Sequence, residues 1–389
     1  MNPPSPDKSP MRIAVVNPYG TGTTYSGPAV FLSRLMEPVS REHHTVVLYG
    51  IRDLHATSLS WATVSVPIMT FRRYSVLEQM RWSFRATRWL LRHLGQYDMV
   101  HFHGAALFNL LPALAAIVRR RRYLLVALSA RGDLSPSARS NRIPLVAALR
   151  RRLVSGATVG LALSDDIASE FAALGLPSQR IVPMQNPVDT TRFAPLVPPG
   201  EDPRALSHTL GFVGKLCARK RPDLVLESLA LLRQRGFHEA RAVFVGPFDS
   251  PEYERFFRDR MTRLAVTDAV ELLGYCADVS TVLAADVSLL VLPSTKEGLP
   301  GALVEAMACG LPAIVTDVGA MGRTVRDAGC GWVVEADPEA IAAAVTELWV
   351  DRDRWIEYST AAQRYARSHC DIKAVVHTYV SALSEAGKR

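Results

Sequence analysis

The stretch from Leu290 to Gly319 constrains the fold of this 389-residue chain more than any other. Two apolar runs of strand length, Val287–Leu292 and Ala313–Thr316, flank a segment with apolar residues at helical spacing: Leu299, Leu303, Ala306 and Met307. A strand, a turn and a helix N-terminus form the unit with which α/β sheets hold phosphorylated ligands. The pattern therefore predicts a short helix between two buried strands, with a ligand loop before the helix.

The predicted helix has residues that favour a helix start at one end and a helix stop at the other, and two carboxylates lie nearby. Pro300 suits the first helical position, Gly310 suits the cap just past the end, and Pro312 prevents continuation. Glu297 lies in the loop before the helix, and Glu305 lies inside it, eight positions further on. Because helical residues rotate by about 100° each, the two acids need not share a face. They can instead reach opposite ends of one elongated ligand.

Apolar runs of strand length alternate with helical patterns along the rest of the chain. They lie at Met11–Asn17, Thr45–Tyr49, Met99–His103, Tyr123–Leu128, Val159–Leu163 and Ile181–Asn186, and again at Thr209–Val213, Ala242–Val245, Val270–Leu273 and Gly329–Val334. This alternation predicts an α/β fold of doubly wound parallel sheets, and the chain length suits two domains.

A proline-rich segment separates the two sets of strand runs. It reads PLVPPGEDPR, a composition typical of a domain boundary. We therefore expect a disordered lead over residues 1–10, an N-terminal domain over 11–194, a linker over 195–204 and a C-terminal domain over 205–365. Residues 366–389 are predicted to form a C-terminal helix that packs back on the N-terminal domain.

Positive charge is concentrated in the first half of the chain. Residues 1–198 carry 23 Lys and Arg against 11 Asp and Glu, whereas residues 199–389 carry 22 against 26. Two basic segments with interleaved apolar residues, Arg81–Arg92 and Arg139–Leu153, suit either peripheral contact with an anionic membrane or a core-facing helix with a solvated arginine face. Because no recognition motif accompanies the charge, we expect no nucleic-acid partner.

Cysteine usage and hydropathy indicate the compartment. Five cysteines lie far apart without CxxC spacing, which predicts a reducing cytoplasm and no structural zinc. The first ten residues, MNPPSPDKSP, are polar and proline-rich, unlike a signal peptide. The most apolar run, Leu107–Val118, is too short to span a bilayer. We expect a cytoplasmic protein, associated with the inner face of the plasma membrane if its basic half contacts lipid.

Two places in the first half could hold a ligand. A loop with Gly20, Gly22 and Gly27 follows the first strand run, and its spacing leaves a ligand loop and an ordinary tight turn both open. His103 ends a strand run before a glycine, where open α/β sheets keep their chemistry. His101 lies in the same run, and we expect only one of the two histidines to face any given site. Neither has further ligands at a spacing that suits a metal.

A basic loop in the second half suits an anion. Gly214 and Lys215 follow a strand run, and Arg219–Arg221 precede a predicted helix, which places four cations between strand and helix. The chain holds six lysines against 39 arginines, and three of the six are Lys215, Lys220 and Lys296. A lysine retained in an arginine-rich chain suits a compact charge on a phosphate. A solvated basic turn is the alternative.

With these residues in view, the chain resembles the retaining glycosyltransferases of family 4. Their GT-B architecture consists of two Rossmann-like doubly wound domains facing a central cleft. Glu297 and Glu305 look like the acids of the family's Glu-x7-Glu signature. Lys215 and Lys220 are similar to its basic pair, although the family usually has Arg at the first position and Gly at the position of Arg221.

The likeness extends into the first half. Tyr25-Ser26-Gly27-Pro28 looks like the family's amino-terminal Gly-Gly loop, with Pro28 in place of the second glycine. His103 matches a histidine that the family has at a strand end. Ser129-Ala130-Arg131-Gly132 resembles an Arg-Gly segment of some members.

The resemblance implies an enzyme that transfers a sugar from a nucleoside-diphosphate sugar to an acceptor hydroxyl with retention, without metal or cofactor. Lys215 and Lys220 would neutralise the diphosphate, and Glu297 and His103 would contact the transferred sugar. These four are the candidate catalytic residues. Glu305 would accept hydrogen bonds from the ribose.

The remaining implied contacts are to the donor and the acceptor. Gly27, Gly214, Gly298, Leu299 and Pro300 would complete the donor site. Arg131 would contact the acceptor or a phosphate. A lipid-linked or anionic acceptor would suit the basic half, and the product would belong to polysaccharide, lipid-linked glycan or glycoconjugate biosynthesis.

Two other functions stay open at this point. One is a non-catalytic subunit that binds a nucleotide sugar, and the other is a nucleotide-sugar epimerase of the same architecture. Incubation with the donor alone separates the epimerase from the transferase, because an epimerase makes an isomer and a transferase needs an acceptor.

Asp351 and Asp353 match a metal-binding pattern of some glycosyltransferases, but in a helical context the two side chains point about 200° apart.

Overall fold

A computed structural model describes residues 10–17, 27–51, 62–70, 75–127 and 143–388 of the chain. The chain divides into two compact units. The first unit comprises Met1–Met184 and Val375–Arg389, and the second comprises Gln185–Ala374. Each unit holds its own parallel sheet and its own buried apolar cluster.

The sheet of the first unit has the order β3-β2-β1-β4-β5-β6-β7, and its pairs are parallel. Its strands are β1 (Arg12–Asn17), β2 (His44–Ile51), β3 (Val64–Thr70), β4 (Met99–His103), β5 (Tyr123–Ala127), β6 (Val159–Ala162) and β7 (Ile181–Pro183). The helices are α1 (Gly27–Glu42), α2 (Val76–His93), α3 (Leu107–Val118), α4 (Pro144–Ser155), α5 (Asp165–Ala173) and most of α13 (Ile372–Lys388).

The sheet of the second unit has the order β10-β9-β8-β11-β12-β13, again with parallel pairs. Its strands are β8 (Thr209–Val213), β9 (Arg241–Val245), β10 (Val270–Gly274), β11 (Leu289–Leu292), β12 (Ala313–Thr316) and β13 (Gly331–Val334). The helices are α6 (Pro222–Gln234), α7 (Pro251–Arg263), α8 (Val279–Ala285), α9 (Gly301–Ala308), α10 (Met321–Ala328), α11 (Pro338–Val350) and α12 (Arg352–Tyr365).

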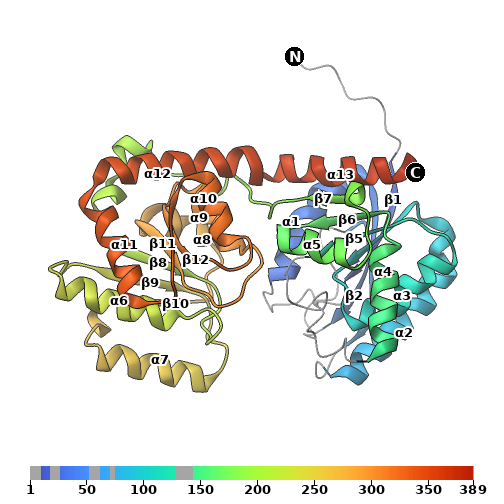
Figure 1. Ribbon diagram of the computed structural model, residues 1–389, viewed down its shortest axis with the longest axis horizontal. Coiled ribbons are helices and arrows are strands. Elements are labelled where there is room, and N and C mark those ends of the chain that lie inside the picture. Colours follow the sequence, from blue (N-terminus) through green and yellow to red (C-terminus); the bar gives the residue numbers. More distant parts are fainter. Residues whose placement is uncertain (1–9, 18–26, 52–61, 71–74, 128–142, 389) are drawn as a thin grey trace, which may run out of the picture. The chain divides into compact units, whose positions relative to one another are not determined.

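The prediction of two doubly wound parallel sheets is confirmed. Central strands such as β4, β5, β8 and β11 are buried along their whole length, as expected for strands covered by helices on both faces. In Figure 1, α6 lies on one side of the second sheet, and α9 with α12 lies on the other. None of the helices in the described residues combines the length and the apolar character that a membrane crossing requires.

The sequence did not predict β3, which forms the edge of the first sheet. Its residues, VSVPIMT, are only partly buried, and Pro67 interrupts the run. Proline cannot donate to a sheet ladder and is confined to edges, so the strand exists because β2 offers a partner. Local pattern alone gives little sign of such a strand.

The chain passes between the units ten residues before the proline-rich segment that was predicted as the linker. The second unit begins at Gln185, and residues 195–204 lie within it. Short 3₁₀ turns form at Pro199–Glu201 and Pro203–Leu206. The proline-rich segment is therefore attached to the second unit, and prolines here fix a folded turn.

A buried ion pair attaches this segment. Arg204 Nη2 lies 2.6 Å from Asp202 Oδ2, and both side chains are at most 4% exposed. The Arg204 guanidinium also donates to the carbonyls of Leu283 and Cys309, at the C-terminal ends of α8 and α9. Cations near helix C-termini satisfy carbonyls that have no partner within the helix. Arg204 thus joins three elements of the second unit.

We predict that Asp202→Asn lowers the free energy of unfolding of the second unit by about 3 kcal/mol, because it leaves a buried guanidinium without its counter-charge. Denaturant unfolding of the full chain measures this. The matched control is Asp259→Asn, which breaks an exposed pair with Arg263 and should cost at most about 1 kcal/mol. Equal losses in the two variants would contradict a structural role for the buried pair.

Candidate active site

The order in which the chain adds strands to the second sheet reverses between β8 and β11. From β8 the chain builds outward to β9 and β10, and from β11 it builds the opposite way to β12 and β13. The loops that leave the C-terminal ends of these two neighbouring strands meet at this switch point, where open α/β sheets bind their ligands. We call them the basic loop (residues 214–221) and the acidic loop (residues 293–300).

The basic loop has two residues with left-handed backbone. Gly214 has φ +143°, and a Cβ atom there would lie 3.2 Å from Lys220 Nζ, so glycine leaves room for the lysine. Arg221 has φ +51° and directly precedes α6. The resemblance predicts glycine at this position, and the backbone explains why, since glycine adopts positive φ without strain. Arg221 holds the same conformation and donates to Asp223 at 2.9 Å.

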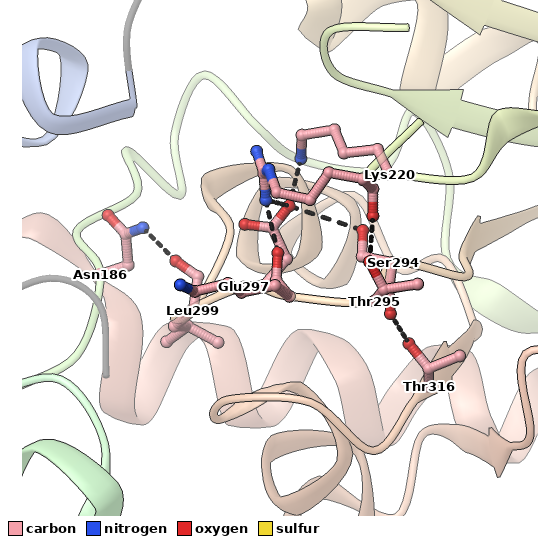
Figure 2. A network of polar contacts seen from close by, with 9 residues as sticks. Asn186, Lys220, Ser294, Thr295, Glu297, Leu299 and Thr316 are labelled. Carbon is pink, nitrogen blue, oxygen red and sulfur yellow. Dashed lines mark hydrogen bonds and ion pairs between the residues drawn. The ribbon is translucent and has the colours of Figure 1, made fainter. Parts of the chain in front are cut away.

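The two loops are joined through Glu297 (Figure 2). Lys220 Nζ lies 2.6 Å from Glu297 Oε1, and both side chains are only 12% exposed. Arg219 Nη1 lies 2.9 Å from the same oxygen, and Ser294 Oγ is at 3.5 Å. One carboxylate oxygen thus meets two cations, the mostly buried Lys220 and the half-exposed Arg219, through charge-assisted hydrogen bonds.

Arg219 also links the loops through its backbone. Its carbonyl accepts hydrogen bonds from Thr295 N at 2.9 Å and Thr295 Oγ1 at 3.1 Å. Its guanidinium donates to the carbonyl of Lys296 as well as to Glu297. The acidic loop is therefore held to the basic loop at three successive residues.

Partners within the second unit fix the peptides around Gly298 and Leu299. Ala320 N donates to the Gly298 carbonyl at 2.8 Å, and Asn186 Nδ2 donates to the Leu299 carbonyl at 2.9 Å. Gly319 has φ +58°, and a Cβ atom there would lie 2.3 Å from the Gly298 oxygen. Because a trans peptide points its N–H opposite to its C=O, the amide of Leu299 points away from this turn.

The acidic loop continues into α9. Pro300 is the N-cap, so the helix starts one residue later than predicted. Gly310 has φ +75° just past the helix, as expected for a C-terminal cap. Glu305 is buried inside α9, and burial raises the pKa of the nearby Cys309 thiol to about 12, partly offset by Arg204 and reinforced by Glu305.

Lys215 lies at the exposed rim of the basic loop. Its Nζ lies 3.0 Å from Asp249 Oδ1, and both side chains are about half exposed. Such pairs are weak, so Lys215 can exchange Asp249 for another anion at little cost. The four cations of the basic loop face three carboxylates, Asp249, Glu297 and Asp223. The described residues contain no group of three or more His, Cys, Asp or Glu side chains that could hold a metal ion.

In the first unit, His103 occupies the corresponding switch point. It ends β4, which neighbours β1, and the chain builds outward in opposite directions from these two strands. His103 is buried, with its ring centroid 5.9 Å from that of Phe31 on α1. Lys215, Lys220, Glu297 and His103 therefore lie in or next to the segments that leave the switch-point strands of their own sheets.

The expectation that His101 and His103 face different ways was wrong. Their ring centroids are 5.9 Å apart, because strand residues two positions apart lie on the same face. His101 is fully buried, and its Nδ1 lies 2.9 Å from the hydroxyl of Tyr379 on α13. It therefore packs behind His103, against the C-terminal helix.

Buried side chains hold the backbone that follows β4. Asn109 Nδ2, on α3, donates to the carbonyls of His103 at 3.0 Å and Gly104 at 2.7 Å. Arg150 Nε, on α4, donates to the Ala105 carbonyl at 3.0 Å. Both side chains are fully buried, so three successive carbonyls are held by hydrogen bonds from the interior of the unit.

Other predicted site residues are covered only in part. Gly27 is the first residue of α1. Gly20, Gly22 and Arg131 lie outside the described residues.

Two family models match the chain. The one described as "Glycosyl transferase 4-like domain" matches residues 26–187, and the one described as "Glycosyl transferases group 1" matches residues 204–369, which include all strands of the second sheet. The chain belongs to the group 1 glycosyltransferases.

Individual members of the family are distant in sequence. The chain is 26% identical to a D-inositol 3-phosphate glycosyltransferase of Salinispora tropica over 332 residues, which cover 76% of this chain and 66% of that protein, just under two thirds. It is 28% identical over 296 residues to a GDP-mannose-dependent alpha-(1-6)-phosphatidylinositol monomannoside mannosyltransferase of Mycolicibacterium smegmatis, covering 71% of this chain and 74% of that one.

A solved structure supports the same fold. HepE of Anabaena, in complex with UDP, superposes with a TM-score of 0.79 at 19% identity, covering 96% of this chain and 100% of HepE. The fold of this group 1 glycosyltransferase is accordingly of the GT-B type.

Sequence reasoning missed three residues of this group 1 glycosyltransferase that position the site. Arg219 was counted only as part of a basic cluster, and Asn186 and Asn109 were not singled out. Asn186 and Leu299 are 113 positions apart, so only folding brings them together. The short distance between Asn109 and a strand-end histidine was the one local sign.

We predict that Asn109→Asp loosens the segment after β4, because a carboxylate cannot donate to the His103 and Gly104 carbonyls. Losing partners of buried carbonyls costs about 1–3 kcal/mol, so amide hydrogen exchange over residues 104–107 should rise roughly tenfold or more. The control is Thr87→Val, which removes a hydroxyl bonded to the Ser83 carbonyl within α2. Unchanged exchange in Asn109→Asp would contradict the role assigned to Asn109.

We also predict that stability falls in acid because of His101. Burial, reinforced by the nearby His103, holds the pKa of His101 well below its usual value of 6.5. As the pH falls below about 6.5, His101 is protonated in the unfolded chain and stays neutral in the folded chain. The free energy of unfolding therefore decreases, by at most about 1.4 kcal/mol per pH unit.

His101→Gln removes this titration and should flatten the slope in denaturant unfolding measured across that range. Burial also lowers the pKa of His43, although the negative charge of Glu42 opposes this shift. His43 is present in both the wild type and the variant, so it contributes equally to the slope in each. An unchanged slope in the variant would exclude His101 as the cause.

Proposed function

We propose that this chain transfers a sugar, with retention of anomeric configuration, from a nucleoside-diphosphate sugar to an acceptor hydroxyl. The observation that carries the proposal is the paired loops at the switch point, where Lys220 and Arg219 converge on Glu297. A diphosphate needs clustered cations, and a sugar needs a fixed carboxylate. In this structure the cations and the carboxylate lie within hydrogen-bond distance of each other.

The ion pair suggests how the donor is received. Without donor, Lys220 and Arg219 neutralise Glu297 and keep its carboxylate oriented. When the diphosphate reaches the basic loop, Lys220 and the exposed Lys215 donate to phosphate oxygens, and Glu297 is free to accept from sugar hydroxyls. Negative charge grows on the diphosphate as it leaves, so the same cations stabilise the transition state more than the bound donor.

The other residues complete the proposed donor site. Amides at Gly298, Leu299 and the start of α9 add partial positive charge near the phosphates. Glu305 accepts from the ribose hydroxyls, and His103 contacts the transferred sugar. Basic side chains supply the positive charge that the leaving group requires, so we propose transfer without a metal ion. The acceptor attacks from the face that the diphosphate leaves, and the leaving phosphate takes the acceptor's proton.

The acceptor is proposed to be an anionic or lipid-linked hydroxyl compound. The relatives in Salinispora and Mycolicibacterium are named for an inositol phosphate and a phosphatidylinositol mannoside. The first half of the chain carries a large excess of positive charge, which suits such acceptors. The five cysteines of the chain, all in its second half, are free thiols, in keeping with a cytoplasmic location.

We predict that Lys220→Met lowers kcat/KM at least about a hundredfold, the usual effect of removing one preorganised donor to developing charge. Methionine keeps an unbranched side chain beside Gly214 and removes the ammonium group, with its charge and its N–H donors. The measurement is sugar transfer from the donor, with the fold checked by circular dichroism.

The matched control is Lys373→Met, which changes an exposed lysine in the same unit. Near-normal turnover of a folded Lys220→Met would refute the phosphate assignment. Incubation with donor alone tests the enzyme class, since an isomerised donor would reveal an epimerase. A chain that binds donor and never turns it over would be a non-catalytic subunit.

The donor itself is identified by thermal shift with UDP-, GDP- and ADP-sugars. A ligand that binds only the folded chain at 100 times its Kd stabilises it by about 2.7 kcal/mol. The cognate donor should raise the melting temperature of the wild type and have less effect on Lys220→Met.

A further inference from the structure

We propose that helix α2 is a docking surface for an anionic lipid bilayer. This inference goes beyond sugar transfer and does not depend on it, because it rests on the side chains of one helix in the first unit. α2 spans Val76–His93 and is drawn with α3 and α4 at the edge of the first unit in Figure 1. Its side chains divide into three faces, and only one of them packs on the protein.

The first face of α2 is the one that holds it to the fold. Its buried residues are Trp82, Ser83, Ala86 and Leu90. At about 100° per residue these four lie within one arc of about 100°. This arc accounts for the packing of the helix on its own unit.

The second face is apolar and exposed. Val76, Leu77, Met80 and Phe84 are each more than half exposed, with Phe84 at 62%, and Leu91 is 40% exposed. These five fall within a separate arc of about 100°, next to the packed face. Scattered apolar residues on a surface are ordinary, but a continuous second stripe along a helix calls for a partner.

The third face is basic. Arg81, Arg85, Arg88 and Arg92 are all exposed and fall within an arc of about 60° beside the apolar stripe. The only acid on α2 is Glu78 in its first turn. An apolar stripe bordered by arginines is the arrangement by which a helix lies in a membrane interface, with apolar side chains among the acyl chains and cations at the headgroups.

The second basic segment of the sequence analysis does not share this arrangement. Residues 139–142 lie outside the described part, and Arg150 on α4 is fully buried and bonded to Ala105. At least one of its arginines therefore serves the protein interior. The structure separates two segments that the sequence left equivalent.

Charge favours a bilayer over a second copy of the chain. In a two-fold dimer built on this face, the same patch would meet itself, and the arginine stripes would lie close together. An anionic bilayer instead offers acyl chains for Phe84 and Met80 and phosphates for the arginines. The positive excess of the first half acts in the same direction.

The test is binding of the full-length chain to vesicles without donor or acceptor. Wild type should sediment with vesicles of phosphatidylglycerol and phosphatidylcholine and bind pure phosphatidylcholine at least about tenfold more weakly, and salt should weaken the binding. Phe84→Gln should weaken binding roughly tenfold or more, through lost apolar burial. Arg85→Gln should weaken it roughly fivefold.

The second unit supplies matched controls. Phe256 is 48% exposed on α7, and Arg255 is exposed on the same helix, so Phe256→Gln and Arg255→Gln change the same residue types elsewhere. Both controls should bind vesicles like wild type. Equal effects of Phe84→Gln and Phe256→Gln would overturn the proposal, as would binding of wild type to neutral vesicles as tight as to anionic ones.

A third outcome would also overturn it. If the wild type sediments as a dimer that Phe84→Gln dissociates, and vesicles do not bind, the surface joins two copies. Phe84 and Arg85 are exposed, so both variants should keep the melting temperature of wild type. Donor binding by thermal shift should also be unchanged, which separates failure of this proposal from failure of the proposed transfer.

Discussion

One carboxylate holds together the two loops on which the candidate site depends. Glu297 meets Lys220 and Arg219 on a single oxygen, at the point where β8 and β11 lie side by side and the chain leaves them in opposite directions. Lys220 and Glu297 are both mostly buried, so each of these two charges needs the other in the absence of a ligand. A ligand that brings its own negative charge can replace Glu297 at Lys220. In the proposed function, this contact orients Glu297 until the diphosphate binds.

The two units solve the problem of placing a loop in different ways. In the second unit, charged side chains and short backbone bonds tie one loop to another. In the first unit, Asn109 and Arg150 reach up from buried positions and hold the carbonyls after β4. These hydrogen bonds fix the carbonyls of three successive residues, His103, Gly104 and Ala105. Each arrangement limits movement of a switch-point loop, which is where small displacements cost the most activity.

Much of the fold could be predicted because its strands are buried on both faces. Runs such as Met99–His103 and Thr209–Val213 match β4 and β8 in full, since a parallel central strand needs continuous apolar residues. The edge strand β3 has no such need and was missed. Proline-rich residues at 195–204 suggested a linker, yet the buried pair of Asp202 and Arg204 places them inside the second unit. Composition reports local stiffness, whereas burial depends on distant partners.

By itself, the sequence determined the described strands other than β3, the two loops at the ends of β8 and β11, and the acids and lysines within them. These follow from local periodicity and from residues that start or end helices. Only the tertiary structure decided which side chains meet: Glu297 with Lys220, Asn186 with the Leu299 carbonyl, His101 with Tyr379. It also decided which faces of α2 stay exposed. The physical reason is that such contacts join residues far apart in the chain, and no local pattern encodes a partner that packing alone brings near.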